Sequence, residues 1–164
     1  MKLTQYSDYS LRVLIYLGVN PDDRLSTITE ISSSYDISRN HVVKVVHNLG
    51  QLGYIETIRG KNGGMRLAMK PEDINVGKLI RKTEANLDIV ECFGEDGNCV
   101  LTPTCQLRWA LDEALTAFLV TLDRYTLADL IKPKKEIQAQ IINILPAKSA
   151  ASQKPKSTTR KTKK

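Results

Sequence analysis

The chain has 164 residues, of which 41% are hydrophobic and 5% aromatic, so we expect one small domain with or without an appendage and a core of Leu, Ile and Val. The formal net charge is +6, but seven cations and no acid lie in residues 148–164, which leaves the rest at about −1 and makes overall basicity a weak argument for nucleic-acid binding. No apolar run approaches the roughly 20 residues that span a bilayer, and the N-terminus has no secretory signal, so we expect a cytoplasmic protein.

Residues 1–19 are predicted to form a helix. Thr4 or Ser7 can cap it, and Asp8 lies near its start, where the helix dipole favours an acid. Apolar residues occur nearly all the way around this stretch, which is typical of a buried helix.

Residues 26–53 have the layout of a helix-turn-helix. Thr27 with Glu30 resembles a capping box at the first helix, and Ser38 can cap a second helix with apolar residues at spacings of three and four. The polar face of the second helix carries cationic and amide side chains, which suit guanine and adenine edges in the major groove. An ordinary solvated helix face is the alternative interpretation. The residues of this face are Arg39, Asn40, Lys44, His47, Asn48 and Gln51.

Two strands, residues 53–58 and 65–69, follow the second helix, and a glycine-rich tip joins them. Strands directly after a recognition helix predict a wing whose tip reaches phosphates or the minor groove. A nucleotide-phosphate loop would need a helix after the glycines, and here a strand follows. The predicted DNA contacts are Thr27, Ser38, Arg39, Asn40, His41, Lys44, Arg59, Lys61 and Asn62.

The second half is predicted to hold a helix over residues 74–81 and a much longer one over residues 105–131. The longer helix repeats apolar residues at Leu107, Leu111, Ala114, Phe118, Leu122 and Tyr125. Since this stripe exceeds what a small domain can cover, we interpret it as a dimerisation helix, with an in-domain core helix as the alternative. A short further helix is predicted after Pro133. The tail after Pro146 is predicted to be disordered, and it either adds non-specific attraction to DNA or only aids solubility.

The fold class is therefore mainly α with a small β wing. We expect a winged helix-turn-helix over residues 1–82, a ligand loop over 83–105, a dimerisation helix over 106–132 and a C-terminal extension over 133–164.

All three cysteines, Cys92, Cys99 and Cys105, lie in one segment rich in Gly, Asn and Asp, which we call the cysteine segment (residues 92–105). Six residues separate the first pair and five the second. Thiolates are preferred ligands of iron–sulfur clusters and of zinc, but zinc sites usually use tight C-x2-C pairs, which are absent here. The spacing therefore favours a cluster. Structural zinc, a disulfide, a thiol redox switch and simple burial are the weaker alternatives.

A winged helix, a three-cysteine loop and a long dimer helix together resemble the IscR/NsrR family of bacterial iron–sulfur transcription regulators. The resemblance covers residues 1 to about 135. Its specific motifs are the N-terminal Met1-Lys2-Leu3-Thr4, the wing Arg59-Gly60-x-x-Gly63-Gly64 and the three-cysteine loop. It implies a homodimeric repressor that binds a palindromic operator, and it argues against an enzyme.

Within this family the chain is similar to the nitric-oxide-sensing branch, which completes a cubane with an aspartate from the partner subunit. Asp8 occupies the matching place. IscR-type members use a histidine shortly after the third cysteine, where this chain has Leu107 and Arg108. The resemblance implies a [4Fe–4S] cluster, or alternatively [2Fe–2S], on Cys92, Cys99, Cys105 and the partner's Asp8, with nitric oxide as the signal that ends repression of detoxification genes. A redox or iron-supply regulator of the IscR type, a zinc-stabilised regulator and a dehydratase-like enzyme are the alternatives.

Overall fold

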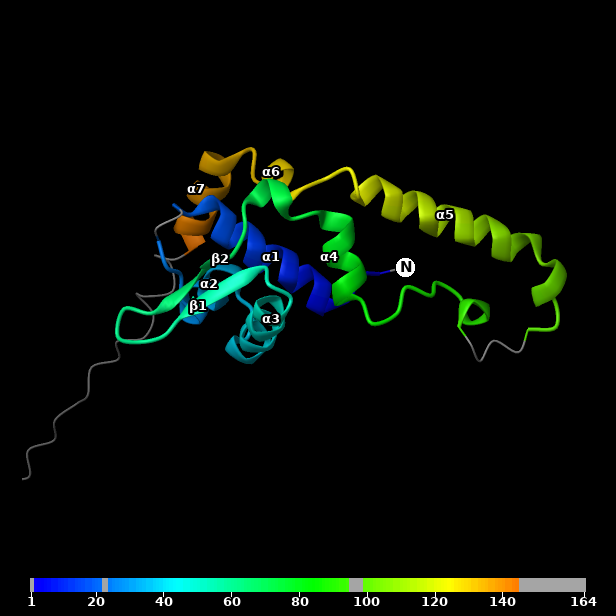
Figure 1. Cartoon of the computed structure of the whole chain (residues 1–164), viewed down its shortest axis with the longest axis horizontal. Helices are drawn as coiled ribbons and strands as arrows, with labels where there is room; N and C mark the ends of the chain where they lie inside the picture. Colours follow the sequence, from blue (N-terminus) through cyan, green and yellow to red (C-terminus); the bar gives the residue numbers. More distant parts are fainter. Residues whose placement is uncertain (1, 22–23, 95–98, 145–164) are drawn as a thin grey trace, which may run out of the picture.

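The computed structural model describes residues 2–21, 24–94 and 99–144. It has two regions (Figure 1). A packed body contains the N-terminal helices, the small sheet and the last two helices, and an arm, formed by residues 85–94 and 99–122, projects from it. The predicted role of the basic tail falls on residues 145–164 and lies outside the described residues.

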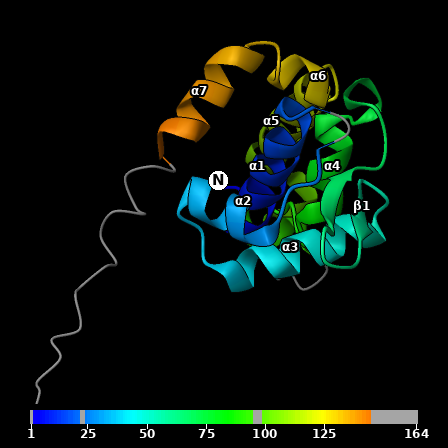
Figure 2. The same cartoon turned by 90° about the vertical axis from the view of Figure 1, so that its left-hand side faces the viewer.

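Helix α1, Gln5–Val19, forms the centre of the body. Thr4 caps it, because its side-chain oxygen accepts a hydrogen bond from the Ser7 backbone N–H. Most of its second half is buried, as expected for a helix that is apolar nearly all round. Seen along the arm, the helices α2, α3, α4, α6 and α7 are arranged around α1 (Figure 2). The prediction of a buried first helix is confirmed, with a start four residues later than expected.

The helix-turn-helix follows the predicted capping signals. Helix α2, Ile28–Tyr35, begins with a capping box in which Thr27 and Glu30 bond each other's backbone N–H. Asp36 ends it in the left-handed conformation, at φ 54°. Ser38 then caps α3, Arg39–Gln51, through the His41 N–H. Val42, Val45, Val46 and Leu49 of α3 are buried against the body.

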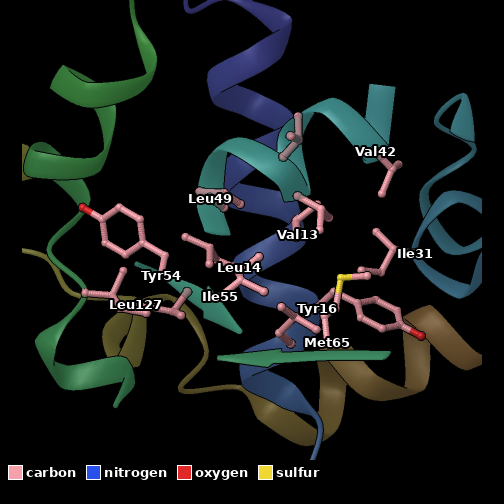
Figure 3. Close-up of a cluster of buried hydrophobic side chains, with 14 of the residues drawn as sticks. Val13, Leu14, Tyr16, Ile31, Val42, Leu49, Tyr54, Ile55, Met65 and Leu127 are labelled. Atoms are coloured by element: carbon pink, nitrogen blue, oxygen red, sulfur yellow. The ribbon is translucent and has the colours of Figure 1, made fainter. Parts of the chain in front are cut away.

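The wing consists of β1, Ile55–Ile58, and β2, Gly64–Leu67, which pair antiparallel with Ile55 opposite Leu67. Gly60 turns the tip at φ +118°, a conformation that favours glycine. The inner face of the wing adds Ile55 and Met65 to one hydrophobic cluster with α1, α2 and α3 (Figure 3). The winged helix predicted from the sequence is therefore confirmed.

The second half differs from the prediction in one respect. Helix α4, Val76–Thr83, leads to the cysteine segment, and α5, Gln106–Leu122, returns from it. The expected single helix over residues 105–131 is wrong, because the chain breaks after Leu122 and restarts as α6, Leu127–Leu130. Thr126 and Asp129 form a capping box that starts α6. Helix α7, Lys134–Ile144, confirms the short helix predicted after Pro133 and contacts α1 and α2.

Candidate metal centre and DNA-binding face

The cysteine segment forms the outer end of the arm (Figure 1). Cys92 lies in a 3-10 turn, Glu91–Phe93, and Cys105 is the residue directly before α5. Both are half-buried, whereas Cys99 is exposed. A second 3-10 turn, Thr102–Thr104, precedes Cys105. The described parts of the segment, residues 92–94 and 99–105, thus form two short turns and irregular backbone, as predicted for a loop.

Arg108 connects the two ends of this loop. Its Nε donates a hydrogen bond to the Cys92 carbonyl oxygen at 3.2 Å, and its guanidinium lies 5.5 Å from the centre of the Phe93 ring. Arg108 lies in the first turn of α5, three residues after Cys105. This contact therefore links the turn that contains Cys92 to the start of the helix that follows Cys105.

The three thiols are suitable ligands for a soft metal centre, although their positions do not form a complete metal site. Among residues 2–21, 24–94 and 99–144, no group of three or more His, Cys, Asp or Glu side chains is close enough to hold a metal ion. Three thiols on one loop nevertheless match the ligands that iron–sulfur clusters use. The residues therefore fit such a group by chemistry, and they leave one ligand to be supplied from elsewhere.

Asp8 lies on the other region of the molecule. It belongs to the first turn of α1 in the body, while the cysteine segment ends the arm (Figure 1). Both of its carboxylate oxygens face Arg12, at 3.0 Å from Nε and 2.9 Å from Nη2. Each of the two side chains is 44% exposed, so the carboxylate is accessible from outside the chain. Asp8 and the thiols are not brought together within one chain.

Eight of the nine predicted DNA contacts divide into two groups. Arg39, Asn40 and Lys44 on α3 are exposed, and so are the wing-tip residues Arg59, Lys61 and Asn62. Thr27 and Ser38, in contrast, use their side-chain oxygens to cap helices.

His41 packs its ring against Tyr9 of α1, with 5.9 Å between ring centroids. Together with Gln5, Tyr6, Lys44 and Val45, these two rings line a small pocket of about 190 Å³ between α1 and α3. The recognition helix therefore rests on the same α1 turns that carry Asp8.

Helix α5 has no buried residue, which is unusual for a helix with this many apolar side chains. The predicted stripe divides into two parts. Leu111, Phe118 and Leu122 are half-buried, and α4 contacts α5. Leu107 and Ala114 are exposed, and so are Trp109 and Val120 on the other side of the helix. The exposed part gives α5 an apolar surface that its own chain leaves uncovered.

Sequence reasoning missed three interactions. Arg12 could have been found from its spacing of four from Asp8, the distance at which helical side chains pair. Arg108 and the Arg81–Asp123 pair have no such local signal, because their partners are 16 and 42 residues away.

The body thus has the architecture of a winged helix-turn-helix DNA-binding protein. No helix within the described part of the chain is long and apolar enough to span a membrane. The family model of Rrf2, described as an iron-dependent transcriptional regulator, matches residues 3–133. The chain belongs to the Rrf2 family of transcription regulators, and its relatives are regulators, not enzymes.

Several relatives have the name HTH-type transcriptional regulator NsrR, including those of Bacillus subtilis and Geobacillus kaustophilus. The protein of Bacillus subtilis (strain 168) is 56% identical over 138 residues, covering 84% of this chain and 94% of that protein. The protein of Geobacillus kaustophilus (strain HTA426) is 52% identical over 140 residues, covering 85% and 95%.

Solved structures agree with the fold. CymR (YrzC), the global cysteine regulator of B. subtilis, is 26% identical with a TM-score of 0.65, covering 79% of this chain and 95% of that one. IscR of T. potens has a TM-score of 0.67 at 22% identity, covering 84% and 91%, and shows the likeness of fold alone.

Proposed function

We propose that this chain is a homodimeric repressor that senses nitric oxide through a [4Fe–4S] cluster held by Cys92, Cys99, Cys105 and the partner's Asp8. The NsrR name of relatives at 52–56% identity supports the assignment to the nitric-oxide-sensing branch. A [2Fe–2S] cluster on the same residues is the alternative. When bound, the cluster would supply iron that reacts with nitric oxide.

The observation on which this proposal rests is the division of the ligands between the two regions. The three thiols are on the outer end of the arm, and the accessible carboxylate of Asp8 is on α1 of the body. The uncovered apolar surface of α5 gives a reason for two chains to associate along their arms. Such a dimer would offer a body from one subunit to the cysteine segment of the other.

The chain's own contacts suggest how a signal at the thiols reaches DNA. Asp8 has a second partner, Arg12, so its carboxylate can exchange between the partner's loop and its own helix. The turns of α1 that carry Asp8 also support α3 through Tyr9 and His41. A change of partner at Asp8 would therefore act on α1, which supports the recognition helix α3. In the dimer this would change the spacing of the two recognition helices and so of the DNA half-sites that they reach.

The test is to replace each cysteine by alanine in anaerobically purified full-length protein. We expect a brown wild-type protein, and loss of cluster and of cluster-dependent DNA binding in each variant. DNA binding is measured by gel shift with duplexes that the loaded protein selects from a random pool. An iron-free wild-type protein with one zinc per subunit contradicts the proposal, and so does unchanged binding after all three thiols are removed.

Asp8→Asn is the sharper variant, because it keeps the size of the side chain and removes the anionic ligand. We expect the dimer to load a cluster that is lost more readily on exposure to air, with the three thiols intact. Glu72→Gln is the matched control, since Glu72 is exposed in the body and lies in the 3-10 turn Pro71–Asp73, away from the cysteine segment. Equal cluster retention in Asp8→Asn and wild type would contradict the role of Asp8.

A further inference from the structure

We propose that Arg108 is a positioning residue of the metal centre, which holds the Cys92 turn against the start of α5 and supplies a positive charge beside the thiolates. This inference rests on the proposed function and names a residue of the chain that is not itself a ligand. The geometry that supports it is independent of the partner subunit, because every atom involved belongs to one arm.

The hydrogen bond fixes the position of a turn. The backbone bonds that the described residues give the 3-10 turn Glu91–Phe93 are short-range, from Phe93 N–H to the Val90 oxygen at 3.0 Å and from Gly94 N–H to the Glu91 oxygen at 3.2 Å. The bond from Arg108 Nε to the Cys92 oxygen, at 3.2 Å, reaches across 16 residues to this turn. The guanidinium also lies over the Phe93 ring at 5.5 Å, so both its charge and its flat shape are used.

Among the residues that the structure describes, no carboxylate is paired with Arg108. Arg108 is half-buried, and within the described ranges it forms no ion pair, whereas Arg12, Arg24, Arg66 and Arg81 each pair with a carboxylate. Glu91, the first residue of the turn, is exposed, and Asp112, one helical turn further along α5, is exposed as well. Thiolates and a carboxylate are all anionic ligands, so a cation at this place stabilises the set that they form.

The two roles can be separated by the choice of substitution. Arg108→Ala removes the hydrogen bond, the ring contact and the charge. Arg108→Gln keeps a donor without charge, and Arg108→Lys keeps the charge without the planar fork. Gln106→Ala is the control, because Gln106 is exposed in the same first turn of α5.

The positioning role is tested on apo-protein, without any cluster. Hydrogen exchange of the Phe93 and Gly94 amides is measured in wild type and variants. We expect roughly fivefold faster exchange in Arg108→Ala, the factor that corresponds to a hydrogen bond of about 1 kcal/mol, and no change in Gln106→Ala. Equal exchange rates in wild type and Arg108→Ala would overturn the positioning role.

The charge role is tested by the reduction potential of the loaded protein. Removing a cation disfavours the gain of an electron, so the potential should become more negative in Arg108→Gln and stay near wild type in Arg108→Lys. If Arg108 had only a structural role, the reduction potential would shift by the same amount in Arg108→Gln and Arg108→Lys. That result would overturn the charge role. If wild type takes up no cluster, the proposed function and the charge role both fail, and the exchange measurement still decides whether Arg108 holds the turn.

Discussion

The body and the arm differ in how their apolar side chains are buried. The body buries 18 apolar side chains in one cluster that joins α1, α2, α3, the wing and the last helices, and this cluster is closed within the chain. The arm buries none of the residues of α5, and it exposes Leu107 at 65% and Trp109 at 60%. The comparison teaches that the DNA-reading region can fold by its own packing, whereas the arm needs a second surface to cover its apolar side chains.

The two regions meet at a joint between α4 and the end of α5. Arg81 donates two hydrogen bonds to the Asp123 carboxylate, at 2.6 and 2.8 Å, and Asn75 Nδ2 donates to the Asp123 backbone oxygen at 2.7 Å. The bond with Arg81 holds the pKa of the Asp123 carboxyl below its usual range. Gly77 of α4 faces the same residue. The direction of the arm is therefore set largely by polar contacts to Asp123.

The largest effect is expected from a charge on the exposed face of the arm. Ala114→Glu places a carboxylate on the predicted dimer stripe, at an exposed position where glutamate is compatible with a helix. We expect loss of the dimer, measured by light scattering after size-exclusion chromatography, with an unchanged circular dichroism spectrum of the body.

Ala139→Glu is the matched control for this variant, since Ala139 is exposed on α7 of the body, away from α5. It should remain dimeric. A dimeric Ala114→Glu protein would show that this face of α5 is not the contact between subunits.

A methyl group at the joint should have the next largest effect. A Cβ on Gly77 would lie 2.1 Å from the Asp123 Oδ1 and 2.9 Å from the Asp123 backbone nitrogen, so the backbone must shift as well as the side chain. We expect Gly77→Ala to lower the free energy of unfolding by about 1–3 kcal/mol, the usual range for overpacking, in urea titrations.

Gly50→Ala separates this clash from the general effect of alanine in a helix. A Cβ on Gly50 would meet only the Ile55 oxygen, at 3.8 Å, which is ordinary contact. This variant should be as stable as wild type or more stable. Equal free energies of unfolding for the two variants would mean that α4 and Asp123 can move apart without loss of stability.

A moderate effect is expected at the DNA-binding face. Lys44→Ala removes an exposed cation of α3, and Arg39→Ala removes one from its first turn, where it makes only a 3.4 Å contact to Thr29. We expect each to weaken operator binding by about 1–3 kcal/mol if a base edge is contacted. Lys135→Ala, an exposed lysine on α7, is the control in the same gel-shift titration. No loss in either α3 variant would contradict the position of the recognition helix.

The smallest effect concerns acid stability at the start of α6. The hydrogen bond from Lys132, with those from the Thr126 N–H and hydroxyl, lowers the pKa of Asp129 from 3.8 to about 2. Because the folded pKa is depressed, this stabilisation is present above pH 3.8 and is lost as the pH falls towards 2. Asp129→Asn should therefore lose less stability than wild type between pH 4 and about pH 2 in urea titrations. Parallel losses in both proteins would contradict this assignment.

Local signals in the sequence were sufficient for the helix-turn-helix and the wing. Thr27 with Glu30, Ser38 and the glycine-rich wing tip each act on neighbours within a few residues, and the structure contains the elements they predict. The helix break after Leu122 was missed because the apolar spacing continues to Tyr125 and hides the capping box of Thr126 and Asp129.

The joint and the arm were harder to predict because their contacts are distant in sequence. Arg81 with Asp123 and Arg108 with Cys92 are brought together by the fold, so no pattern of spacing indicates them. The cysteine spacing predicted a soft metal centre, but the sequence alone could not show that Asp8 lies apart from the thiols on another region.

The central claim is that the state of the thiol-bound cofactor controls DNA binding by the dimer. Its most direct test is the visible spectrum of anaerobic full-length protein during titration with nitric oxide, with gel shift of the same samples. The account predicts that the iron–sulfur absorption is lost in step with release of the DNA, while a variant with all three cysteines replaced by alanine shows neither change. DNA that stays bound after the absorption has been bleached would contradict it.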